Sequence, residues 1–146
     1  MKPITYSLQF RGVAAQLDRG LRKEARAPGC ALVTSLTPAG VAGTFTWAAG
    51  DDEAIFESTL AFTDRGGFDE EGTILFSLGH ALRVRGRGQL APSSDPHLLH
   101  GTVVWEVTGG DGQLDDAAGR ITSNFLLSDT GELTENQLGV IFTSSR

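Results

Sequence analysis

The chain has 146 residues, of which 40% are hydrophobic and 21% charged, and this composition excludes an intrinsically disordered chain. A formal net charge of −6 opposes nucleic-acid binding, because such binding needs clustered Lys and Arg to neutralise phosphates. Nineteen glycines favour strands and tight turns, because glycine weakens helix interiors and accepts positive φ in turns. We therefore expect residues 1–146 to form a single all-β domain.

The amino-terminal residues contain one charged side chain but no continuous apolar stretch. We expect neither a signal peptide nor a membrane span, and a cytoplasmic location. Cys30 is the only cysteine, so no intrachain disulfide can form, and we expect it to pack as a small hydrophobic side chain.

The first predicted elements are strands over residues 4–15 and 21–27, which form a hairpin. Apolar side chains recur every four residues within 13–26, so a helix over that segment is the competing interpretation. Gly20 in the middle of the segment counts against the helix, because glycine destabilises a helix interior.

Turn-forming residues then separate a series of short segments that alternate in polarity or are rich in β-forming residues. Eight more strands are predicted, near residues 31–36, 43–48, 54–62, 73–78, 81–90, 102–108, 120–127 and 133–142. An antiparallel meander without crossover helices hides its edges most completely by closing on itself. The predicted fold is therefore one closed antiparallel β-barrel of about eight to ten strands.

Three surface features follow from the same strand assignment. The acidic segments 51–53, 69–71 and 115–116 lack the ligand spacing of calcium loops, so we interpret them as solubilising turns. Segment 91–96 contains two prolines that cannot join a central ladder, which places it at a barrel mouth. Arg83, Arg85 and Arg87 alternate and so share one strand face, which we expect to be a solvated outer face rather than an anion site.

Residues 103–125, VVWEVTGGDGQLDDAAGRITSNF, resemble the strand, glycine-rich turn and strand of the allene oxide cyclase-like and dirigent β-barrels. In this reading the glycines at 109–112 permit a tight reversal, and Leu114 plugs the barrel end. Gly119 lets the returning strand pass closely. The resemblance implies a barrel enclosing an apolar cavity, self-association as a dimer or trimer, and in some members the steering of a ring closure or isomerisation.

His80 and Asn136 are the candidate catalytic residues on apolar strand faces. His80 continues the face of Ile74 and Phe76 if no bulge intervenes, which makes it an acid-base or ligand-contacting group. The alternative is a core histidine satisfied by a hydrogen bond, or one beside a bulge. Asn136 shares its strand parity with Leu138, and the alternative role is a capping amide at the strand end.

Glu57 and Glu106 become candidates under a different assumption about the barrel. If the polar strand faces line the lumen, burial raises the pKa of both carboxyls toward useful general-acid values. The alternative is that both are exposed strand glutamates on the outer wall.

The candidate ligand-binding residues are mainly aromatic side chains that exclude water from a guest, with one serine that orients it. They are Phe62, Phe76, Trp105, Ser123, Phe125 and Phe142. Plain core packing is the alternative explanation for the aromatic side chains, because such rings dominate any core by area.

We predict no metal and no cofactor. The nearest approach to a ligand set is Asp95, His97 and His100, whose spacing matches no recognised metal motif. The sequence therefore predicts a barrel that binds a small apolar or amphipathic molecule, leaning towards a cofactor-independent isomerase or cyclase. A non-catalytic carrier with the same cavity and a structural barrel with a filled core are the alternatives.

Overall fold

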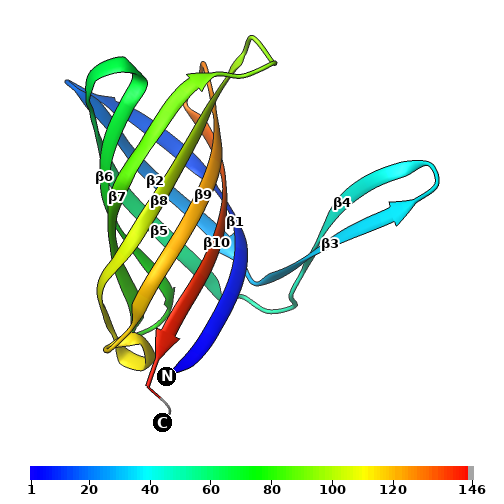
Figure 1. Ribbon diagram of the computed structural model, residues 1–146, viewed down its shortest axis with the longest axis vertical. Coiled ribbons are helices and arrows are strands. Elements are labelled where there is room, and N and C mark those ends of the chain that lie inside the picture. The colour runs from blue at the N-terminus through cyan, green and yellow to red at the C-terminus, as the bar shows by residue number, and fades with distance from the viewer. Residues whose placement is uncertain (145–146) are drawn as a thin grey trace.

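The computed structural model describes residues 1–144 and is built from ten strands and two short 3₁₀ turns (Figure 1). The strands are β1 Lys2–Leu17, β2 Gly20–Pro28, β3 Cys30–Thr37, β4 Gly40–Trp47, β5 Glu53–Phe62, β6 Gly67–Ser77, β7 His80–Pro92, β8 Leu98–Asp111, β9 Ala118–Ser128 and β10 Glu132–Thr143. The turns are η1 Asp64–Gly66 and η2 Gly112–Leu114.

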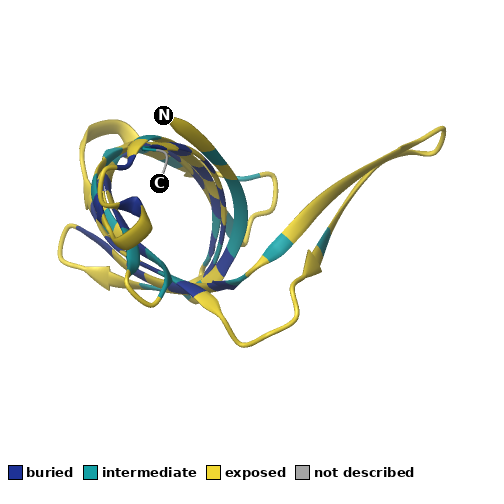
Figure 2. Cartoon of the chain, turned by 90° about the horizontal axis from the view of Figure 1, so that it is seen from below, coloured by how far each residue is buried: buried dark blue, intermediate teal, exposed yellow. Residues whose placement is uncertain are grey.

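Eight of the strands close into an antiparallel barrel in the order β1-β10-β9-β8-β7-β6-β5-β2. Closure comes from β1, which pairs with β10 along Lys2–Val13 and with β2 along Arg11–Leu17. The predicted closed antiparallel meander is confirmed, with one addition. Strands β3 and β4 leave the barrel between β2 and β5 and project as a separate two-stranded hairpin (Figures 1 and 2).

The helix considered for residues 13–26 is wrong, because that segment is the hairpin of β1 and β2. Its apolar side chains recur every four residues, a spacing that is also even and so equally satisfies the two-residue period of a strand. Gly20 opens β2, where it pairs with Leu17. The spacing alone therefore could not separate the two structures.

The interpretation of residues 69–71 as a solubilising turn is also wrong. Strand β6 begins at Gly67, six residues before the predicted start at Thr73, and it pairs with both β5 and β7 over this segment. Strand alternation puts Glu70 on the same inward face as Phe68, and both side chains are buried. A charged residue is thereby carried into the barrel.

The two ends of the barrel differ. At the lower end in Figure 1 the chain turns through η2, and Leu114 in this turn is buried in the core. A Cβ at Gly119 would overlap the carbonyl oxygen of Val140, and its φ of +146° also requires glycine. The predicted close passage of the returning strand is therefore confirmed. The turn between β7 and β8, at residues 93–97, lies at the opposite end of the barrel, as expected.

Among residues 1–144, no helix is long and apolar enough to cross a membrane.

Candidate functional site

Three ionisable side chains lie together inside the barrel without exposure to solvent. Lys23 Nζ donates to Glu135 Oε1 at 2.7 Å and lies 3.1 Å from Glu70 Oε2. All three side chains are 0% exposed. Taking charges out of water costs several kcal/mol for each ion, so their geometry must supply good hydrogen bonds in return.

Further hydrogen bonds extend this triad across the barrel. Ser58 Oγ donates to Glu70 Oε2 at 2.6 Å, and Trp105 Nε1 donates to Glu70 Oε1 at 3.2 Å. On the other side, Gln137 Nε2 donates to Glu135 Oε2 at 3.3 Å. Tyr6 Oη donates to the amide oxygen of Gln137 at 3.2 Å. We call the set Tyr6, Lys23, Ser58, Glu70, Glu135 and Gln137 the interior polar cluster.

Strand alternation explains why these side chains point inward. Lys23 lies between Leu21 and Ala25 in the inward series of β2, and all three are buried. Glu135 similarly follows Leu133 along β10. The cluster draws on β1, β2, β5, β6 and β10, so closure of the barrel is what brings it together.

Burial sets the electrostatics of the cluster. Loss of solvent raises the pKa of Glu70, the attraction of Lys23 lowers it, and repulsion from Glu135 raises it again, with the net shift upward. Burial also raises the pKa of Tyr6, helped by the carboxylate of Glu135, so the phenol stays protonated as a donor. Protonation of Glu70 would leave Lys23 and Glu135 as one balanced ion pair beside a neutral carboxylic acid.

Aromatic rings enclose the triad. Lys23 Nζ lies 3.6 Å from the centroid of the Phe125 ring and 5.8 Å from that of Phe56. The Phe56 and Trp105 rings pack with centroids 5.3 Å apart, and Phe68 meets Phe125 at 6.0 Å. Ring faces carry negative potential, so this lining favours a positive charge at the centre of the barrel.

Ser123 is the unsatisfied polar group of the interior. It is 2% exposed and is the register partner of Gln137 on β10. Among the described side chains it is the one whose buried oxygen has no hydrogen-bond partner. Because buried hydroxyls are nearly always paired, this oxygen marks a position where a guest or a water would complete the hydrogen bonding.

The structure places three of the predicted ligand-binding residues inside the barrel. Trp105 and Phe125 are 0% exposed, and Ser123 joins them from β9. Phe76 is partly buried and meets the Tyr6 ring edge-on, with centroids 5.1 Å apart.

Phe62 and Phe142 do not lie in the interior. Phe62 is 42% exposed at the end of β5, and Phe142 is 40% exposed on the outer face of β10. Both faces of β10 carry large apolar residues, so the alternation did not reveal which face is inward. Asn136 shares the outer face with Phe142 and accepts a hydrogen bond from Gln9 Nε2 at 3.0 Å.

Glu57 and Glu106 also lie outside, which corrects the assumption that polar strand faces line the lumen. Their side chains are 49% and 57% exposed, in ion pairs with Arg22 and Arg120. The apolar faces turn inward because that removes the larger nonpolar area from water.

His80 does not continue the inward face of Ile74. A register shift between Leu75 and Ser77 breaks the alternation before β7 begins, so the condition for an inward His80 fails. Its Nδ1 instead accepts a hydrogen bond from the backbone N–H of Gln113 at 3.0 Å, which ties β7 to η2 at the lower barrel end. The structure therefore agrees with the alternative interpretation of His80, a hydrogen-bonded histidine beside a bulge.

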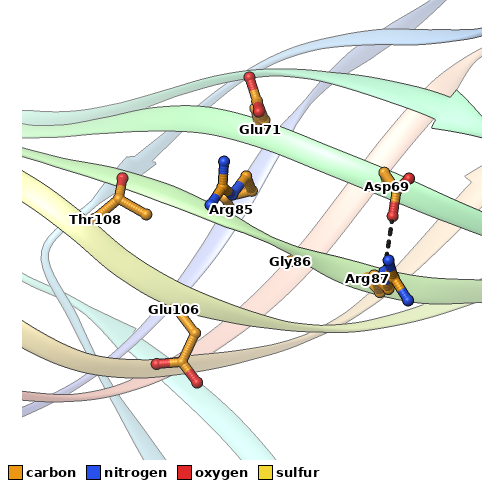
Figure 3. A pocket seen from close by; sticks show the side chains of 7 residues that line it. All are labelled: Asp69, Glu71, Arg85, Gly86, Arg87, Glu106 and Thr108. Atoms are coloured by element: carbon orange, nitrogen blue, oxygen red, sulfur yellow. Dashed lines mark ion pairs between the residues drawn. The ribbon is translucent and has the colours of Figure 1, made fainter.

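The three alternating arginines lie on the outer wall, as predicted. Around Arg85 and Arg87 the wall has a shallow groove of about 420 Å³ (Figure 3). Arg87 pairs with Asp69 at 3.3 Å, and the groove is also lined by Glu71 and Glu106. With three carboxylates against two guanidinium groups, this groove is poorly suited to an anion.

Sequence reasoning missed the charged members of the interior polar cluster. The strand alternation did contain a signal. Lys23 lies two residues from the buried Leu21, and Glu135 lies two residues from the buried Leu133, so each charged side chain shares a strand face with a buried leucine. Glu70 carried no such signal while its segment was interpreted as a turn.

In residues 1–144 there is no group of His, Cys, Asp or Glu side chains arranged to hold a metal ion. His97 lies 3.5 Å from Asp129, and His100 Nε2 forms a hydrogen bond with the side-chain oxygen of Asn124, both at the surface.

No protein-family model and no curated protein matches the chain. The chain is similar to a solved structure described as the pterocarpan synthase dirigent protein GePTS1, with 15% sequence identity and a TM-score of 0.49. The match covers 100% of this chain and 89% of that chain. At this identity and TM-score, neither family membership nor activity follows from the similarity.

Proposed function

We propose that the barrel binds a small, largely apolar molecule in its interior and polarises an oxygen of that molecule with Lys23 and Glu70. The observation that carries the proposal is the unpartnered hydroxyl of Ser123 beside a fully buried ion cluster. A buried cluster is weak evidence for stability, because packed hydrophobic residues of similar volume often stabilise as well or better. A buried carboxyl with a raised pKa between apolar walls, such as Glu70, is instead typical of binding and catalytic sites.

The same groups support a rearrangement of the guest. Protonated Glu70 would donate to a carbonyl or epoxide oxygen, which stays bonded to the guest, while the Phe125 and Phe56 rings stabilise positive charge that develops on the hydrocarbon. An isomerisation or ring closure neither adds nor removes atoms, so the proton given to the oxygen can return to the carboxylate at the end. Such a reaction is accelerated mainly by holding a productive conformer.

Turnover of candidate polyene and epoxide substrates tests the catalytic part of the proposal. Glu70→Gln should abolish turnover while retaining the fold, because the amide keeps the size of the side chain but cannot supply the proton. The matched control is Glu57→Gln, which makes the same change on the outer wall and should leave turnover intact. Equal turnover in both variants would remove Glu70 from the mechanism.

A carrier function without chemistry uses the same interior. Mass spectrometry of the natively purified protein would then show a bound small molecule, and no candidate substrate would be converted. Loss of that bound mass in Glu70→Gln would still support recognition of an oxygen by the cluster.

A structural barrel with a filled core is the second candidate, because large rings lie directly over inward-facing glycines. A Cβ at Gly101 would overlap the Phe125 ring, one at Gly88 the Phe68 ring, and one at Gly139 the Tyr6 ring. In this case the rings complete the core, as side chains do in many small barrels. An experimental interior cavity well below about 300 Å³ would favour this candidate over binding.

A further inference from the structure

The β3–β4 hairpin exposes an apolar face that the rest of the chain does not cover. None of residues 30–47 is charged. In the antiparallel register Leu36 lies opposite Val41, and these side chains are 79% and 74% exposed. The same face continues with Leu32 opposite Phe45 and ends on Trp47, which stacks on Phe45 with centroids 5.5 Å apart. We call Leu32, Leu36, Val41, Phe45 and Trp47 the hairpin face.

This hairpin has the properties of an assembly arm rather than a free loop. Isolated two-stranded hairpins are at best marginally stable in water, and exposed uncharged strand edges invite pairing with other chains. Figure 2 shows the hairpin extending away from the barrel, exposed for nearly its whole length. An ordered arm of this composition is expected to be covered in solution.

The outer wall of the barrel is uneven in polarity, and its more apolar part offers a matching surface. The wall of β2, β5, β6 and β7 carries alternating acidic and basic side chains, including Arg22, Glu57 and Arg85. The wall of β9 and β10 instead exposes an apolar stripe of Leu138, Val140 and Phe142, next to Thr122 and beyond it Val104 of β8. We call this stripe, with Val104 and Thr122, the apolar wall.

The hairpin leaves the barrel beside the apolar wall. Cys30 at its base donates through Sγ to the carbonyl oxygen of Ser7 on β1, at 3.4 Å. Because Cys30 belongs to the same strand parity as Leu32 and Leu36, the base of the hairpin face is turned toward β1. A groove of about 550 Å³ lies between them, lined by Leu32 on the hairpin side and Leu138 on the wall.

We infer that this surface is a self-association interface, in which the hairpin face of one copy packs on the apolar wall of a second copy and the second hairpin returns the contact. The hairpin face is uncharged, and on the apolar wall the exposed Arg120 beside Val140 is already paired with Glu106. The two surfaces lie beside each other on one chain, so a two-fold axis can satisfy both at once. The hairpin is about 27 Å long and about 10 Å wide, from eight residues per strand and ordinary strand spacings. Two hairpin faces and two wall patches then bury about 1,100 Å², which exceeds the roughly 1,000 Å² expected of a specific interface and lies at the small end of such interfaces.

Sedimentation velocity of the full chain over a wide range of protein concentration tests this interface. The wild type should form dimers. Leu36→Lys on the hairpin face and Leu138→Glu on the apolar wall should each weaken the dimer at least tenfold, because each places a charge in an apolar contact. The matched controls are Ser35→Lys on the opposite hairpin face and Thr73→Glu on the charged wall, and both should leave the dimer intact.

Mixing the two weakened variants makes the test specific. In a mixed dimer, the hairpin face of the Leu36→Lys copy packs on the apolar wall of the Leu138→Glu copy, so the new ammonium meets the new carboxylate. The other contact joins an unchanged hairpin face to an unchanged wall. The mixture should therefore dimerise more tightly than either variant alone. A monomeric wild type, or a mixture that associates no better than its components, overturns the inference. Because Glu70 plays no part in this interface, Glu70→Gln should leave the dimer unchanged whatever its effect on binding.

Discussion

Removal of Lys23 tests whether the interior polar cluster is a balanced set of charges. In Lys23→Met the carboxyl groups of Glu135 and Glu70, which lie 2.7 Å and 3.1 Å from Nζ, remain buried without their cation. Breaking a buried ion pair in this way costs about 3–5 kcal/mol, a large part of the roughly 5–15 kcal/mol that stabilises a typical domain. The loss should shrink at acid pH, because Glu70, whose pKa is raised by burial, is then neutral.

Urea unfolding gives the free energy of unfolding for this comparison, with Arg22→Met as the matched control. Arg22 is the neighbour of Lys23 on β2 but points outward, with 45% of its side chain exposed and surface pairs to Glu24 and Glu57. Surface pairs of this kind are worth about 0–1 kcal/mol, so the control should change little. A Lys23→Met variant no less stable than Arg22→Met would refute the assignment of a buried charge at Lys23.

Three further outcomes are expected. Because the folded-state pKa of Glu70 is raised, its stabilising contribution is complete below the ordinary carboxyl pKa and is lost as pH rises through the raised value. The free energy of unfolding should therefore decline across that pH range, with a slope of at most about 1.4 kcal/mol per pH unit. Glu70→Gln should lack this decline. Gly119→Ala should destabilise by about 1–3 kcal/mol because of its positive φ and overlap with Val140, whereas Gly43→Ala, which meets open space, should change the melting temperature little. His80→Ala should cost about 1 kcal/mol through loss of the Gln113 hydrogen bond, and unchanged guest binding in that variant would separate His80 from the interior site.

The fold was largely predictable because turns and alternation are local properties of the chain. Leu114 was expected at a barrel end, and it is buried in η2. The reversal expected at 109–112 begins later, because β8 continues through Asp111 and only Gly112 lies in the turn. The projecting hairpin was not foreseen, although its two strands were. Nothing local distinguishes strands β3 and β4 from barrel strands, because membership in the barrel depends on which distant strand each one pairs with.

The interior was predicted only in part. Trp105 and Phe125 were identified by their large size and by the strand face on which they lie. Large rings on the inward face bury the most apolar area, so these two features predict burial directly. The placement of Asn136 and Phe142 was wrong, because Leu133 and Ile141 supply a competing apolar face on the same strand. Lys23 was overlooked because an isolated charge is ordinarily solvent-exposed, and only the meeting of several strands shows that it has buried partners.

The indole N–H resonance of Trp105 reports most directly on whether a guest enters the interior. The chain has two tryptophans, so Trp47→Phe leaves Trp105 as the one indole signal, and its N–H donates to Glu70. Titration with a small apolar ketone such as acetophenone should shift this resonance to saturation at one ketone per chain, and Glu70→Gln should weaken the binding. A Trp105 resonance that does not move at any ketone concentration would contradict binding beside the interior polar cluster.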